Sequence, residues 1–177
     1  MATRLTVRIV FAIALFSVSG FAGGLFAEEP PGKSQPDVNQ LMAAAAESYA
    51  QGKYAEAIAH YRQAADSGNA WGQNNLAWIY ATVKQPELRD GAKAVAYALK
   101  ATAQEPQNAA FCRTLAAAHA RAGQFEKAIA AQEKFLALLA ADQTLAAELK
   151  QQLRADHQAK LALYRKQQAY VDDKERE

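Results

Sequence analysis

A small residue beside a branched aliphatic residue recurs three times in this chain of 177 residues. The pairs Ala57-Ile58, Ala94-Val95 and Ala128-Ile129 follow one another after 37 and 34 residues. Further contact positions come four and seven residues after each alanine, which places them on one face of a helix. Recurrence at this interval is typical of helical repeat arrays, whose units bury their apolar faces only by stacking. The pattern therefore predicts a series of stacked helices.

A second helical pattern precedes each of these pairs, as in 76–80 and 115–119. In two units a glycine separates the two patterns, and an aromatic residue follows the glycine two positions later, in Gly52-Lys53-Tyr54 and Gly123-Gln124-Phe125. Glycine can end a helix in a left-handed conformation. Each unit is therefore expected to be a pair of helices joined by a tight turn.

This succession resembles the tetratricopeptide repeat (TPR) from about residue 38 to residue 141, with Pro106 closing the second unit. The junction that contains Gly68-Asn69-Ala70 and Asn75-Leu76-Ala77 is similar to a Sel1-type repeat. The resemblance implies an all-α solenoid of three antiparallel helix pairs plus a C-terminal capping helix, as in exported bacterial proteins of this family. The second unit has five more residues between its helices than the third, within 82–91. Such an insertion is expected to form a loop.

The composition favours helix throughout, since alanine is abundant while the chain has only 9 Gly and 5 Pro. The last helix is expected to use Asp142 as its N-cap and to cover the final apolar face of the array. The predicted organisation is a flexible lead-in over 28–37, repeats over 38–141, a capping helix over 142–170 and a charged tail over 171–177. Within the repeats, helices are predicted at about 38–51, 54–67, 70–83, 91–104, 108–121 and 125–140.

The first 27 residues have the features of a secretory signal. Arg4 and Arg8 are their only charged residues, and an apolar stretch follows up to Ala27. A basic start, an apolar run and small residues before a polar segment describe a signal peptide. Cleavage after Ala27, cleavage after Ala22 and an uncleaved membrane anchor remain alternatives. Each of them predicts export, to the periplasm or beyond, with the anchor as the one possible membrane tether.

Neither the charge balance nor the reactive residues of the sequence point to nucleic-acid binding or catalysis. Beyond residue 27 the chain has equal numbers of basic and acidic residues, so no electrostatic field predicts a nucleic-acid partner. The single cysteine, Cys112, is expected to be buried. His60, His119 and His157 belong to different predicted helices and form no metal-ligand pair, and His119 is expected to pack with a local hydrogen bond. Since no nucleophile or phosphate-loop motif is present, we expect no enzyme, metal or cofactor.

Protein binding is the function that the repeat resemblance implies. TPR arrays present the first helix of each pair along a concave groove, and Trp and Arg often dominate contact energies there. Aligning the chain to that pattern gives the candidate partner-binding residues Tyr49, Trp71, Asn74, Asn75, Trp78, Arg113 and Arg121. Trp71 and Trp78 could equally belong to the core. The carboxylate clamp of co-chaperone relatives is not expected, because Met42, Ala46 and Ala110 occupy its positions.

Three functional interpretations follow from the sequence. The first is an exported adaptor or scaffold that binds a protein or peptide segment in the groove. The alternative is a structural or assembly component of the cell envelope, whose contacts lie on the convex face, the inter-helix loop or the terminal helix. A third interpretation is a protein that handles envelope polymers, because Sel1-type repeats recur in such systems.

Overall fold

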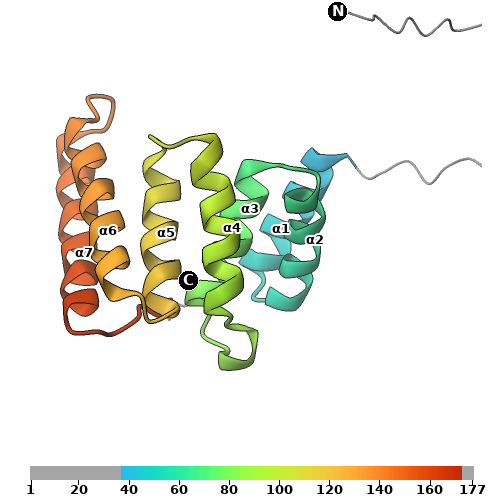
Figure 1. The fold of residues 1–177 in the computed structure, drawn as a ribbon. Helices are drawn as coiled ribbons and strands as arrows, with labels where there is room; N and C mark the ends of the chain where they lie inside the picture. Colours follow the sequence, from blue (N-terminus) through green and yellow to red (C-terminus); the bar gives the residue numbers. More distant parts are fainter. Residues whose placement is uncertain (1–36, 173–177) are drawn as a thin grey trace, which may run out of the picture. The chain divides into compact units, whose positions relative to one another are not determined.

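A computed structural model describes residues 37–172 of the chain. Helices are the only regular structure in this part of the chain (Figure 1). They are α1 (Val38–Ala50), α2 (Tyr54–Asp66), α3 (Ala70–Thr82), a short 3-10 helix η1 (Pro86–Leu88), α4 (Gly91–Gln104), α5 (Ala109–Arg121), α6 (Phe125–Ala141) and α7 (Ala147–Arg165). The prediction of an all-α fold is confirmed for these residues. The predicted signal segment 1–27, most of the lead-in and residues 173–177 lie outside the described part.

Each helix packs against the next one in the chain, from α1 on α2 to α6 on α7. Helices that are not consecutive also pack together, most extensively α3 with α5. Figure 1 shows α7, α6, α5 and α4 in succession from the left, with α3, α1 and α2 at the right. The helix α3 therefore has neighbours on several sides, and most of its residues are buried.

Small residues allow the helices to approach closely. Ala57, Ala94 and Ala128, the alanines of the recurring motif, are each 0% exposed. At Gly72 of α3, an added Cβ would lie 2.9 Å from the Cβ of Ala64. A larger side chain at any of these positions would push two helices apart, since packed interiors leave little free volume.

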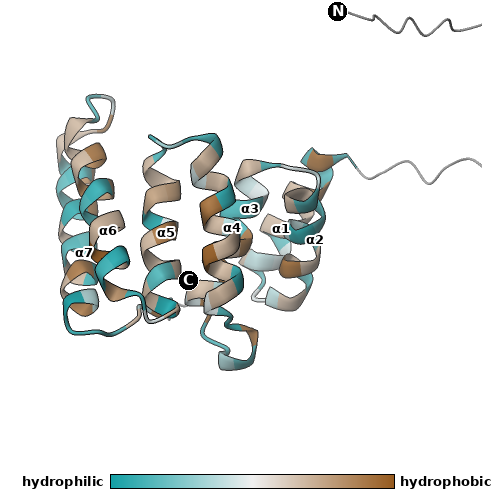
Figure 2. Cartoon of the chain, in the orientation of Figure 1, coloured by the Kyte–Doolittle hydropathy of each residue, from teal (hydrophilic) through white to brown (hydrophobic). Residues whose placement is uncertain are grey.

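The hydrophobic core extends along the helices rather than filling one centre. Its largest cluster includes Leu76, Ile79 and Tyr80 of α3, and smaller clusters lie between α5, α6 and α7. Figure 2 shows that polar and apolar residues share each helix. Among the described residues, no helix is long and apolar enough to cross a bilayer.

Glycines end the first helix of two pairs, as predicted. Gly52 and Gly123 have φ angles of +72° and +73°. The N–H of each glycine and of the following residue bond back to carbonyls of the preceding helix, which is the Schellman arrangement. Gln167, after α7, has the same arrangement with a φ of 58°. A side chain in this conformation carries a steric cost that glycine avoids.

The ends of the capping helix differ from the prediction. Asp142 follows the last residue of α6, and its side chain accepts hydrogen bonds from the N–H and hydroxyl of Thr144. The expectation that Asp142 is the N-cap of the last helix is therefore wrong, because its carboxylate closes a local turn instead. The helix α7 begins at Ala147, without a side-chain cap, and ends at Arg165 rather than near 170.

The predicted insertion between the helices of the second unit forms a loop, as expected. It contains η1, and the backbone N–H of Asp90 at its end donates to the carbonyl of Tyr80 at 3.0 Å. The Arg89 side chain donates from Nε to the carbonyl of Val83 at 2.6 Å. These bonds hold the loop against the last turn of α3.

Candidate partner-binding site

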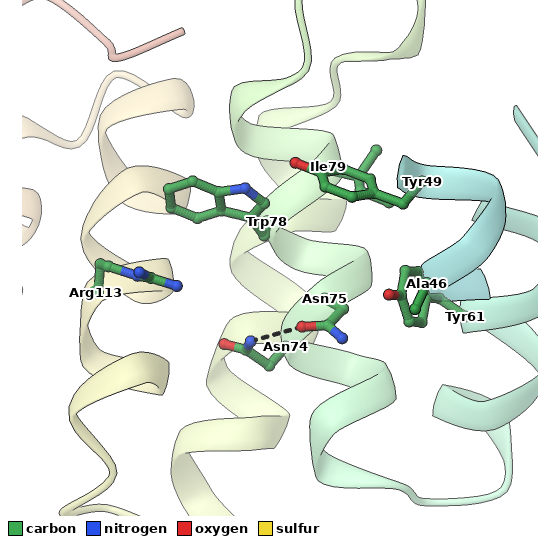
Figure 3. Close-up of a pocket in the computed structure, with 8 residues that line it drawn as sticks. All are labelled: Ala46, Tyr49, Tyr61, Asn74, Asn75, Trp78, Ile79 and Arg113. Atoms are coloured by element: carbon green, nitrogen blue, oxygen red, sulfur yellow. Dashed lines mark hydrogen bonds between the residues drawn. The ribbon is translucent and has the colours of Figure 1, made fainter. Parts of the chain in front are cut away.

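A pocket of about 250 Å³ lies where α1, α3 and α5 meet. Pockets for drug-sized ligands usually exceed about 300 Å³, so this volume suits one or two side chains of a partner. Its walls include five of the seven candidate residues from the sequence, from three different helices (Figure 3). The lining residues are Ala46, Tyr49, Tyr61, Asn74, Asn75, Trp78, Ile79 and Arg113.

Helical spacing explains why these residues meet. Ala46 and Tyr49 are three residues apart on α1, and Asn74 and Trp78 are four residues apart on α3, so each pair shares a face. The opposite side of α3 carries Leu76 and Tyr80, which are buried in the core. Core packing thus fixes the rotation of α3 and directs its polar side chains into the pocket.

Asn74 contributes a buried acceptor without a partner. Its side chain is 2% exposed, and its Nδ2 donates to Oδ1 of Asn75 at 3.1 Å. No hydrogen-bond donor reaches its own Oδ1. Figure 3 shows this oxygen on the side of the pocket that faces Arg113. An unpartnered buried acceptor costs about 1–3 kcal/mol, which a donor from a bound segment would offset.

Arg113 contributes a cation in a partly dehydrated position. Its guanidinium lies 4.9 Å from the centroid of the Trp78 ring, and its Nε is buried without a hydrogen-bond partner. Burial lowers the pKa of Arg113, while the nearby charges of Asp156 and Asp172 act in the opposite direction. The planar guanidinium suits a carboxylate or a main-chain carbonyl. Dehydration strengthens either interaction.

Two candidate residues lie elsewhere. Trp71 is 46% exposed and packs edge-on against Phe111 with ring centroids 4.9 Å apart, but it does not line this pocket. Arg121 donates from Nε to the carbonyl of Ala81 at 2.7 Å and from Nη2 to the carbonyl of Tyr170 at 2.9 Å. Arg121 therefore joins parts of its own chain. The sequence allows Trp78 either a core or a groove position. In the structure it lines the pocket and also packs against the core cluster.

Sequence reasoning missed two groups of residues near the pocket. Tyr61 of α2 and Ile79 of α3 line it, although neither was among the candidate partner-binding residues. Tyr170 reaches the Trp78 ring from beyond α7, with ring centroids 6.2 Å apart. A single aromatic residue in a polar C-terminal stretch carries no sequence signal of such a contact.

His119, His157 and the single cysteine have structural surroundings. His119 is buried, and its Nδ1 lies 2.8 Å from Oε1 of Gln124, which confirms the predicted packing with a local hydrogen bond. Cys112 is buried as predicted, and burial raises the pKa of its thiol, which disfavours the reactive thiolate. His157 is 1% exposed, 3.0 Å from Nε2 of Gln132. No cluster of three potential metal ligands occurs among residues 37–172.

Comparison with protein-family models and with curated proteins identifies no relative of this chain. No protein-family model matches the chain, and no curated protein is significantly similar to it in sequence. The function must therefore be inferred from the geometry of the site and from the pattern of the sequence.

Proposed function

We propose that this chain is a non-enzymatic protein-interaction module whose pocket between α1, α3 and α5 binds an extended or helical segment of a partner protein. The observation that carries the proposal is the combination of Asn74, Trp78 and Arg113. Two of these side chains hold a buried polar atom without a partner, and the third supplies an aromatic wall. A partner that provides a donor for Asn74 and an acceptor for Arg113 would satisfy both atoms.

The proposal includes a TPR-like solenoid as the scaffold. Consecutive packing of α1 with α2, α3 with α4 and α5 with α6 is what three stacked helix pairs would give, with α7 as the cap. Contact between α3 and α5 fits the stacking of first helices in neighbouring pairs. The pocket would then lie on the concave face of the array, where first helices of successive repeats are exposed to a partner.

The chemistry of the pocket indicates the kind of ligand. Arg113 and the amide of Asn74 favour main-chain groups or a carboxylate, and Trp78 favours a flat or apolar side chain. Three helix pairs form a short surface, so affinity should depend on a few anchor residues rather than on total area. We therefore expect modest affinity with a clear dependence on these three residues.

Export is part of the proposal. Its support is the basic and apolar segment up to Ala27, which lies outside the described residues. The adaptor would meet its partner in the periplasm or outside the cell, soluble or tethered by an uncleaved segment. Fractionation of tagged protein tests this, and full-length soluble protein recovered in the cytoplasm would contradict it.

Capture of the partner by variants of the full chain tests the binding proposal. Arg113→Ala and Asn74→Ala should each reduce the amount of a partner that the wild-type chain recovers from the envelope fraction. Arg165→Ala is the matched control, because Arg165 is exposed on α7 and pairs with the exposed Glu133. Surface pairs of this kind contribute little.

The outcome that contradicts the proposal also identifies its alternative. A partner whose recovery ignores both pocket variants, but falls when the loop 83–90 or α7 is altered, would bind outside the pocket. The chain would then be a structural or assembly component that makes contacts through those elements.

A further inference from the structure

Residues 166–172, here called the C-terminal segment, lie against the helices that form the pocket. The carbonyl of Tyr170 accepts a hydrogen bond from Nη2 of Arg121 at 2.9 Å. The N–H of Asp172 donates to the carbonyl of Thr82 at 2.8 Å. The segment has no regular secondary structure beyond its first turn. The surface of α3 and α5 thus already binds an irregular stretch of chain through its main-chain atoms.

The aromatic ring of Tyr170 is held between two helices. It lies 6.2 Å from the ring of Trp78 on α3, measured between centroids. On α7, Nζ of Lys160 lies 4.5 Å from the centroid of the same ring. A cation over a ring face and a neighbouring ring both favour an aromatic side chain at this position.

The charges on the two sides are complementary. The receiving surface carries Arg113, Arg121 and Lys160, with Asp156 paired to Lys160 at 2.8 Å. The C-terminal segment brings the carboxylate of Asp172, whose charge favours the protonated form of Arg113. The hydroxyl of Tyr170 donates to Oδ1 of Asp172 at 3.3 Å. The surface thus receives an aromatic ring directly, and the residue two positions later through its main-chain N–H.

Two observations indicate that the C-terminal segment can be replaced by another one. Both main-chain hydrogen bonds to α5 and α3 can be made by any peptide. Trp78 contacts Arg113 in the pocket as well as Tyr170, so a ligand of the pocket and the segment share one wall.

We propose that the surface formed by Trp78, Arg113, Arg121 and Lys160 recognises an extended segment that carries an aromatic residue and binds through main-chain atoms of that residue and of the residue two positions later. The C-terminal segment occupies this surface as an internal ligand, and a partner segment replaces it. This inference rests on the proposed function and adds the chemistry of the partner. A partner binds only those molecules in which the internal ligand has left the surface. The apparent affinity for a partner is therefore the intrinsic affinity multiplied by the fraction of molecules with an open surface.

A labelled peptide with the sequence of residues 166–172 tests the proposal in fluorescence-anisotropy titrations of the full chain. The Tyr170→Ala chain should bind the peptide about tenfold or more tightly than the wild type, because its own segment competes less. Asp172→Pro, which removes the N–H donated to Thr82, should act in the same direction. Gln168→Ala is the control within the segment, with wild-type affinity expected. Circular dichroism verifies that each chain is folded.

Further variants show where the peptide binds. Adding Trp78→Ala to the Tyr170→Ala chain should abolish the gain, and a peptide with Ala at the tyrosine position should not bind either chain. Equal affinity of the wild-type and Tyr170→Ala chains, with both folded, would overturn the proposal. So would a wild-type dimer that Tyr170→Ala dissociates in analytical ultracentrifugation, because the segment would then bind a second copy.

Failure of this inference and failure of the proposed function give different results. A partner that depends on Arg113, but is captured equally by the wild-type and Tyr170→Ala chains, would overturn only the replacement of the segment. A peptide that binds as expected, together with a natural partner that ignores Arg113 and Asn74, would overturn only the proposed function.

Discussion

At the scale of single residues, the site depends on buried polar atoms that the fold leaves without partners. Oδ1 of Asn74 and Nε of Arg113 face the same pocket from α3 and α5. Each such atom destabilises the folded chain by about 1–3 kcal/mol. A replacement by an apolar residue would remove that cost together with the ability to recognise polar groups. A bound segment that supplies a donor and an acceptor would offset this cost.

His157 shows the opposite case, a buried polar side chain with a purely structural environment. Its ring packs against Phe135 with centroids 4.2 Å apart, and Nε2 of Gln132 donates toward its Nδ1. Burial lowers its pKa to about 3, with Lys160 and Arg113 acting in the same direction. Asp156 lies 3.8 Å from Nε2 and opposes the shift, but its own pairing with Lys160 and its exposure to water weaken that effect.

This environment predicts a loss of stability in mild acid. In the unfolded chain the pKa of a histidine is about 6.5, so acid protonates the unfolded state first. The stability that the folded chain gains from a neutral His157 is fully present above pH 6.5 and is lost as the pH falls toward 3. Between pH 7 and pH 5 the free energy of unfolding should fall by about 1–2 kcal/mol more for the wild type than for His157→Gln. Urea unfolding at the two pH values measures this difference, and parallel losses in both proteins would contradict the assignment.

At the scale of helices, small residues set how closely neighbours pack. The alanines at 57, 94 and 128 recur because each lies where its helix meets another without any exposed surface. Most of the other alanines in the chain have no such constraint, as Ala59 and Ala130 are exposed on the same helices. The same residue type therefore has two different roles within a few positions.

This difference predicts unequal effects of one substitution. Ala57→Leu and Ala128→Leu should each lower the free energy of unfolding by about 1–3 kcal/mol, because the added atoms overpack a helix junction. Ala59→Leu and Ala130→Leu add the same atoms to exposed positions and should change it by less than about 0.5 kcal/mol. Thermal or urea unfolding compares the four variants. Equal effects within each helix would show that the predicted helix faces are wrong.

Most helix ends could be predicted because local residues determine them. The helix α2 was expected to begin at 54 and α6 at 125, and both do so, directly after turns whose glycines adopt positive φ. The ends of α7 could not be predicted in this way. Asp142 can cap a helix or close a turn, and only the packing of α6 decides between them. At the other end Gln167 replaces the glycine that would have marked the stop.

At the scale of the whole described part, the candidate site was predictable as far as helical periodicity determines it. Asn74, Asn75 and Trp78 share a face of α3, and that face meets Tyr49 and Arg113 in one pocket. The alignment to the repeat pattern predicts both Arg113 and Arg121 as partner-binding residues. The side chain of Arg121 instead contacts the carbonyls of Ala81 and Tyr170. Those contacts depend on the path of the C-terminal segment, which no local pattern specifies.

Contacts between consecutive helices dominate this part of the chain, and some contacts also link more distant elements. The helix α3 packs against α5, and the C-terminal segment after α7 reaches the last turn of α3 through Asp172 and Thr82. Both links meet at α3, which also supplies most of the pocket wall. A partner bound there would contact the helix at which both links meet.

The central claim is that a partner segment binds in the pocket between α1, α3 and α5. Site-specific photo-crosslinking in the full chain tests it most directly, with a photoreactive residue at Ala46 or at Ala130. Both alanines are exposed, but Ala46 lines the pocket whereas Ala130 lies outside it on α6. We expect crosslinks to a partner protein from position 46, reduced by Arg113→Ala, and none from position 130. Crosslinks from position 130 alone would contradict the claim and place the partner on the outer helices.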